Sequence, residues 1–264
     1  GGGGEMNVFQ AVLLGFVQGL TEFLPVSSSG HLILVRRLLG LESSCLLFDL
    51  VLHLGSLVAV VVYFRREIIS LLRPPFKRLG LLALATVPAA ALAFLMSGFI
   101  DEVFGGGDFL WLTFALTGAL LLIGERMTRR RALPGCGIGL KQAAVMGLMQ
   151  AAALLPGLSR SGSTLFGGLA SGADREEAAK FSFLMSVPII LGSAAVGLIG
   201  AASGAGGLEL TVGWWETLCG GVAAAVSGGL AIGLMMKAVK KANCRPFAYY
   251  LFGVSVLSLV LALV

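Results

Sequence analysis

Six long stretches of this 264-residue chain hold at most one charged side chain each. An α-helix needs roughly 20 apolar residues to cross the hydrocarbon core of a bilayer. Charged residues make up only 12% of the chain, whereas soluble domains have about 25%. The chain therefore cannot cover its surface with polar groups, and we expect that surface to face lipid. The predicted transmembrane spans are residues 46–64, 79–97, 109–124, 179–200, 213–236 and 247–264.

Two further apolar stretches are interrupted in the middle by proline, serine and glycine. None of the four resulting segments is a comfortable span by length, so each pair predicts a re-entrant helical hairpin. Non-helical backbone at membrane depth is tolerated only where protein or a water-filled cavity covers it. Both joints are therefore expected to lie inside the protein. The pairs are residues 6–24 with 30–40, and residues 139–155 with 162–171.

Lysine and arginine gather in three predicted loops and are absent from two others. By the positive-inside rule the basic loops are cytoplasmic, so six spans place both termini outside. The first hairpin then enters from outside and the second from inside. The pair Arg36 and Arg37 disagrees, because it would lie outside, but three consistent loops outweigh it. The basic loops are 65–78, 125–131 and 237–245, and the loops without Lys or Arg are 98–108 and 201–213.

The two broken regions repeat one pattern. Twelve residues separate Gln18 from Gly30 and Gln150 from Gly162, and each interval holds a proline followed by SSSG or SRSG. Each half carries three spans, so the second half is inverted, and inverted repeats place their site where the joints meet. We thus predict an all-α integral membrane protein with six transmembrane helices, two re-entrant hairpins and an inverted repeat. Its single membrane domain has halves 5–131, with hairpin 6–40, and 132–264, with hairpin 139–171.

The first joint combines groups suited to nucleophilic catalysis. Glu22 is a carboxylate in a membrane segment, which marks a functional candidate, and Gln18 lies on the same helix face. If a helix begins near Ser28, either Ser27 or Ser28 can reach His31. Serine, histidine and a carboxylate together activate a hydroxyl nucleophile. The alternative is that the hydroxyls cap a helix beside an ordinary buried histidine.

The second joint has the composition of an anion site. A guanidinium, hydroxyls and the N–H groups of a helix start bind phosphate well, and arginine offers a bidentate grip. The alternatives are that Arg160 reaches a membrane interface or simply pairs with Glu22. The candidate residues are Arg160, Ser159, Ser161 and Thr164.

Other polar features predict less. His53, four residues after Asp49, is expected to form a satisfied buried pair rather than to line the cavity. The four cysteines lack the spacing of a metal site or a disulfide framework. The net charge of +5 fits cytoplasmic loops, so we expect no nucleic-acid partner.

The stretch QGLTEFLPVSSSGH at 18–31, with PGLSRSG at 156–162, resembles undecaprenyl pyrophosphate phosphatases of the bacitracin-resistance type. The resemblance covers nearly the whole chain. It implies a hydrolase of the bacterial inner membrane, open to the periplasmic side, that removes the terminal phosphate of undecaprenyl pyrophosphate. Such enzymes recycle the lipid carrier of peptidoglycan synthesis. The family's first motif is commonly E-x-x-x-E, and Gln18 here leaves Glu22 as the sole acid.

The resemblance also implies roles for single residues. Ser28 is the expected nucleophile, and His31 is an acid/base or an orienting group, while the attacking serine and the choice between Glu22 and His31 as base stay open. A divalent cation, Mg²⁺ or Ca²⁺, is expected with Glu22 as its candidate ligand, without an organic cofactor. The partners expected are the polyprenyl diphosphate, membrane lipid and a second copy in a homodimer. The residues expected to bind substrate phosphate are Arg160, Ser27, Ser159, Ser161, Thr164 and Gln18.

Two rival functions are weighed. Type-2 phosphatidic acid phosphatases also have S-G-H and S-R elements, but they need a further histidine, and none follows Arg160 here. A transporter or flippase of a polyprenyl phosphate would share the inverted repeat with broken helices. The cluster of serine, histidine and glutamate favours the enzyme, because transport needs no nucleophile.

Overall fold

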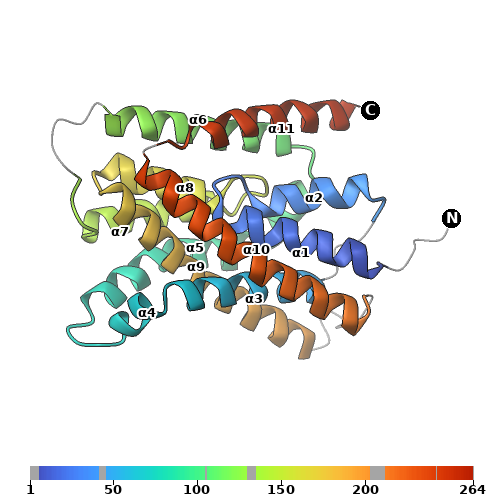
Figure 1. Ribbon diagram of the computed structural model, residues 1–264, viewed down its shortest axis with the longest axis horizontal. Helices are drawn as coiled ribbons and strands as arrows, with labels where there is room; N and C mark the ends of the chain where they lie inside the picture. Colours follow the sequence, from blue (N-terminus) through green and yellow to red (C-terminus); the bar gives the residue numbers. More distant parts are fainter. Residues whose placement is uncertain are drawn as a thin grey trace.

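The computed structural model describes residues 6–41, 46–104, 106–129, 135–202, 212–241 and 243–263. Within these residues the chain forms eleven α-helices and no β-strand (Figure 1). Six helices are long and apolar enough to cross a membrane, which confirms the predicted number. They are α3 (Leu46–Tyr63), α5 (Lys77–Phe104), α6 (Leu110–Arg129), α9 (Arg175–Ala202), α10 (Trp214–Lys240) and α11 (Arg245–Leu263).

The remaining helices are short and include both predicted broken pairs. The first pair forms α1 (Val8–Phe23) and α2 (Ser28–Leu38), and the second forms α7 (Leu140–Ala152) and α8 (Arg160–Ser171). One short helix, α4 (Arg65–Leu71), lies where the sequence predicts a basic loop.

Both second helices begin two residues earlier than the sequence predicts. The hydroxyl of Ser27 accepts the N–H of Gly30 at 3.3 Å, and the hydroxyl of Ser159 accepts the N–H of Gly162 at 3.1 Å. Serine is a preferred N-cap because its oxygen satisfies such an unpaired N–H. The two caps therefore place Arg160 in the first turn of α8, not in the joint before it.

Small residues let the helices pack closely. Helix α1 packs along α10, which also contacts α3, while α7 packs against α5 and α8, and α6 packs against α11. A Cβ atom at Gly15 or Gly19 of α1 would overlap the carbonyl oxygens of Gly220 or Ala224 on α10. Close approach of this kind is typical of membrane helices, so the glycines of α1 set its distance from α10.

The basic segments gather at one end of the molecule. Helix α4 and the ends of α6 and α10 lie at one end of the long axis, whereas α1 begins and α11 ends at the other (Figure 1). Arg36, which disagreed with the loop charges, is only 8% exposed and pairs with Asp49 on α3, with Nη1 2.9 Å from Oδ2. A buried, neutralised arginine carries little weight in the loop count, so the disagreement is reduced to Arg37.

The two joints meet near the middle of the molecule (Figure 1). The backbone N–H of Gly157 donates to the hydroxyl of Ser29 at 3.4 Å, and the hydroxyl of Ser161 donates to the carbonyl oxygen of Leu24 at 3.0 Å. Next to the joints, the ring of Phe23 packs edge-on against the ring of Phe183 on α9. Residues more than a hundred positions apart are thus brought into one polar cluster.

Candidate active site

Glu22, in the last turn of α1, lies at the centre of this polar cluster and is 7% exposed. Its Oε1 accepts a hydrogen bond from Nη2 of Arg160 at 2.8 Å. Its Oε2 accepts from the hydroxyl of Ser28 at 2.6 Å and from the amide of Gln18 at 3.1 Å. One carboxylate therefore joins the first joint to the second.

This connection limits how far apart the Ser28 hydroxyl and the Arg160 guanidinium can be. Only two hydrogen bonds and one carboxylate separate the Ser28 hydroxyl from the Arg160 guanidinium. The two groups therefore lie within about 8 Å of each other, the reach of two hydrogen bonds with one small anion between them. A single phosphoryl group can contact both.

The two serines that the sequence left open differ in their surroundings. The Ser27 hydroxyl is buried, caps α2 and lies 3.3 Å from the Ser29 hydroxyl. Ser28 is partly exposed, and its hydroxyl donates to Glu22. Among the hydrogen bonds of the described residues, Ser28 is the serine of this joint that reaches the carboxylate.

His31 does not make the expected contact with a serine hydroxyl within the described part of the chain. Its Nδ1–H donates to the backbone carbonyl of Ser27 at 2.7 Å, and the hydroxyl of Tyr250 lies 2.8 Å from Nε2. The ring of His31 thus faces Tyr250 of α11. Among the described residues, the carboxylate in hydrogen-bond contact with the Ser28 hydroxyl is that of Glu22.

The second joint supplies the guanidinium of Arg160, and hydroxyl groups surround the start of its helix. The Arg160 side chain is 15% exposed, and its Nη1 donates to the carbonyl of Ser182 at 3.3 Å. The hydroxyls of Ser159 and Ser161 are 3.3 Å apart, and Thr164 donates to the Arg160 carbonyl at 2.8 Å. The three hydroxyls thus support the start of α8, while Arg160, with five N–H donors, has further donors to offer an anion.

Gln18 is fully buried, and its amide oxygen has no hydrogen-bond partner among the described residues. Gln150, its counterpart in the repeat pattern, also has a buried amide oxygen without a described partner, while its amide donates to the Ala85 carbonyl at 3.3 Å. Each glutamine therefore presents an unused acceptor beside a joint.

The described residues do not fit a metal ion held by protein ligands alone. No group of three His, Cys, Asp or Glu side chains that could hold a metal occurs among them. Glu22 is the one carboxylate of the joint, and both of its oxygens already accept hydrogen bonds. We therefore derive no step of the reaction through a metal.

His53 contacts the backbone of Asp49. Its Nδ1 is 2.8 Å from the backbone carbonyl of Asp49, whose carboxylate pairs with Arg36. The ring is half-buried. The expected pairing of His53 with Asp49 is thus formed through the backbone carbonyl.

Two contacts of the site were missed from the sequence. Tyr250 on α11 binds His31, and Ser182 on α9 binds both Arg160 and Thr164, with the two hydroxyls 2.6 Å apart. Both residues lie in predicted spans, where the sequence shows only that a polar side chain interrupts an apolar run. The sequence does not show which joint that side chain faces.

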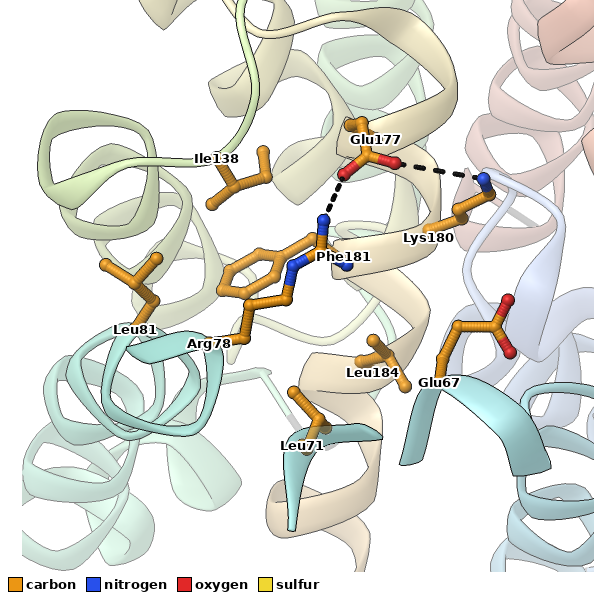
Figure 2. A pocket seen from close by; sticks show the side chains of 9 residues that line it. All are labelled: Glu67, Leu71, Arg78, Leu81, Ile138, Glu177, Lys180, Phe181 and Leu184. Atoms are coloured by element: carbon orange, nitrogen blue, oxygen red, sulfur yellow. Dashed lines mark hydrogen bonds and ion pairs between the residues drawn. The ribbon is translucent and has the colours of Figure 1, made fainter. Parts of the chain in front are cut away.

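A separate hollow lies at the end of the molecule where the basic segments gather (Figure 2). Glu177 pairs there with Arg78 at 3.2 Å and with Lys180 at 3.8 Å, above an apolar floor that includes Phe181. No residue of either joint lines it. Charged surface side chains therefore line this hollow, and its lining residues include no nucleophile beside a base.

Comparison with known proteins agrees with this geometry. The family model described as bacitracin resistance protein BacA matches residues 11–257. A protein of Carboxydothermus hydrogenoformans is 41% identical over 97% of this chain and 98% of its own length. Proteins of Rubrobacter xylanophilus (43% identical, 98% and 99% covered) and Methanobrevibacter smithii (39% identical, 96% of both) are similar in the same way. All three are named undecaprenyl-diphosphatase. The chain therefore belongs to the BacA family of bacitracin resistance proteins.

Proposed function

We propose that this chain is an undecaprenyl-diphosphatase, a membrane hydrolase that converts undecaprenyl pyrophosphate to undecaprenyl phosphate and inorganic phosphate. It thereby recycles the lipid carrier of peptidoglycan synthesis. The observation that carries the proposal is the hydrogen-bonded series of Ser28, Glu22 and Arg160 at the meeting point of the joints. The names of the full-length relatives support the same activity.

Substrate binding activates the base. In the free protein Arg160 neutralises Glu22. The terminal phosphoryl group of the substrate competes for Arg160, because arginine forms strong bidentate hydrogen bonds with phosphate. Once Arg160 turns to the phosphate, Glu22 loses its cationic partner and becomes a stronger acceptor for the Ser28 proton.

The Ser28 oxygen then attacks the terminal phosphorus while its proton passes to Oε2 of Glu22. The bond from that phosphorus to the bridging oxygen breaks, and the lipid monophosphate leaves with the proton from Glu22. Arg160 and the N–H groups at the start of α8 neutralise the charge that develops on the phosphoryl oxygens. The product of this step is a phosphoserine.

Water completes the cycle by attack on the phosphoserine. Glu22 accepts a proton from the attacking water and returns it to the Ser28 oxygen as that oxygen leaves phosphorus. Inorganic phosphate is released and the free protein is restored. His31 holds the Ser27 carbonyl throughout and acts as an orienting group, while Ser27, Ser159, Ser161, Thr164 and Gln18 fix the groups that touch the phosphate.

The packing supports two re-entrant hairpins in an inverted repeat. Helix α1 packs on α10 as α7 packs on α5, and α6 with α11 and α3 with α9 form pairs between the halves. The hydroxyls of Ser27 and Ser159 make the same capping hydrogen bond, each to the N–H three residues later. We assign residues 5–131 and 132–264 to the two halves of one membrane domain.

The charge distribution supports an orientation in the inner membrane. The basic segments share one end of the molecule (Figure 1), and positive loops stay cytoplasmic. Both termini and the opening to the active site are then on the periplasmic side. The lipid diphosphate enters from there with its tail in the bilayer. A homodimer and a divalent cation stay predictions.

Phosphate release from undecaprenyl pyrophosphate by purified protein in detergent tests the activity. We expect wild-type protein and the Ser29→Ala control to release phosphate, and Ser28→Ala to be slower by at least about a hundredfold, since it loses the group that the base serves. Absence of release by wild-type protein would overturn the proposed function. Wild-type turnover by Ser28→Ala would overturn the role of Ser28.

A transporter of polyprenyl phosphate is the second candidate, because broken helices in inverted repeats are typical of secondary transporters. The discriminating experiment compares detergent with liposomes. Phosphate release in detergent, where no second compartment exists, requires hydrolysis. Flux of polyprenyl phosphate across liposomes without any hydrolysis would favour the transporter.

A further inference from the structure

One residue of the first joint has an unfavourable backbone conformation. Ser27 has φ 72° and ψ 105°, in the region that favours glycine. Such a conformation persists only where surrounding contacts hold it. Ser28 follows directly, and its hydroxyl reaches Glu22 at 2.6 Å. The conformation of Ser27 therefore sets the direction of the Ser28 hydroxyl.

A side chain of α2 holds this backbone. The Ser27 carbonyl accepts the Nδ1–H of His31 at 2.7 Å. The imidazole is itself held by two rings: Tyr250 of α11 stacks on it, with ring centres 5.7 Å apart and 11° between planes, and Phe114 of α6 meets it edge-on at 5.2 Å. Helices α2, α6 and α11 thus fix one imidazole.

The hydrogen bonds determine where the imidazole carries its proton. A backbone carbonyl can only accept, so Nδ1 must donate, and Nε2 of the neutral ring must then accept. The hydroxyl of Tyr250, 2.8 Å away, is the donor that Nε2 needs. Without it the Ser27 carbonyl still selects the Nδ1–H form, but Nε2 loses its donor and a single hydrogen bond is left to fix the orientation of the ring.

We propose that Tyr250 is a positioning residue of the hydrolysis site. Its O–H donates to Nε2 and so fixes the orientation of the imidazole whose Nδ1–H holds the Ser27 carbonyl, which keeps the Ser28 hydroxyl directed at Glu22. The effect on turnover rests on the proposed role of Ser28 as nucleophile. The hydrogen bond to Nε2 does not.

The kinetic test uses Tyr250→Phe, which keeps the stacked ring and removes the O–H. We expect kcat to fall about three- to tenfold, the loss expected from one hydrogen bond, with KM unchanged because Arg160 is untouched. Tyr249→Phe is the matched control, because Tyr249 is the neighbouring tyrosine on α11, is exposed and has no hydrogen bond described for its side chain. Equal kcat values for the two variants would overturn the proposal.

A spectroscopic test reads the hydrogen bond at Nε2 directly. The chain has two histidines, so ¹⁵N-histidine labelling gives one set of ring signals for His31 and one for His53. We expect both rings to carry the proton on Nδ1 in the wild type, and the Nε2 signal of His31 alone to shift in Tyr250→Phe, because that nitrogen loses the donor to its lone pair. His53 donates to the Asp49 carbonyl and serves as the internal reference.

Unchanged His31 signals in Tyr250→Phe would overturn the proposal whatever the kinetics show. If the Nε2 signal moves and Ser28→Ala remains fully active, the role of Ser28 in the proposed function fails while the role of Tyr250 in holding the imidazole stands. The two failures are thus distinguishable.

Discussion

The ion pair between Glu22 and Arg160 gives a prediction in which stability and activity respond differently. The two side chains are 7% and 15% exposed, and Oε1 and Nη2 are 2.8 Å apart. Removing one partner of a buried pair costs about 3–5 kcal/mol, because the other charge is left uncompensated. Glu22 keeps two donors in Arg160→Met, so we expect the lower value, about 3 kcal/mol, for that variant.

The double variant Glu22→Gln/Arg160→Met has neither charge. Replacing a buried pair by neutral groups is often neutral or stabilising, so we expect its stability to return to within about 1 kcal/mol of the wild type. Its activity should not return, since it lacks both the base and the phosphate clamp. Loss of the base alone slows turnover by about 10²–10⁴.

Thermal unfolding in detergent, followed by tryptophan fluorescence, measures the stability term, and phosphate release from the same preparations measures turnover. For a chain of this size 3 kcal/mol corresponds to a decrease in Tm of roughly 6–12 °C. Arg78→Met is the matched control, because Arg78 pairs with Glu177 at an exposed position where such pairs contribute about 0–1 kcal/mol.

Two results would refute this reasoning. If the decrease in Tm for the double variant equals the sum of the two single decreases, Glu22 and Arg160 do not act as a coupled pair. If Arg160→Met retains the wild-type kcat/KM, Arg160 does not bind the transferred phosphoryl group.

Three further predictions concern packing, thiol reactivity and orientation. Gly19→Ala should lower stability by about 1–3 kcal/mol, because its Cβ would overlap the α10 backbone, whereas Gly229→Ala, with open space around it, should leave the Tm near that of the wild type; equal Tm values would refute the close contact. Burial raises the pKa of the Cys244 thiol to about 11, so at pH 8 it stays protonated and a single-cysteine variant that keeps it should resist maleimide. The exposed Cys136, kept as a single cysteine, should react with an impermeant maleimide in inverted vesicles and not in intact cells; the reverse pattern would invert the proposed orientation.

The transmembrane helices could be predicted because hydropathy is a local property. Each predicted span overlaps an observed helix, and the errors lie at the ends. Helix α5, for example, continues to Phe104, past the end of the predicted span 79–97. The pairing of the two joints also followed from the sequence, since Gln18 and Gln150 begin the same pattern of spacing.

The directions of individual side chains could not be predicted. The spacing of Ser28 and His31 allowed a hydrogen bond, but the ring turns to Tyr250, more than two hundred residues later. The sequence suggested that Arg36 is a loop charge, because it does not show that Arg36 of α2 pairs with Asp49 of α3. In each case the partner lies on another helix, and the packing of helices decides the contact.

The most direct test of the mechanism is the search for a phosphoserine. Wild-type protein is mixed with undecaprenyl pyrophosphate that carries a radioactive terminal phosphate, quenched in acid during turnover and digested. The account predicts label on the peptide that contains Ser28, and in Ser28→Ala no label and turnover slower by at least about a hundredfold. Turnover by Ser28→Ala at the wild-type rate, with no labelled peptide in either protein, would contradict it.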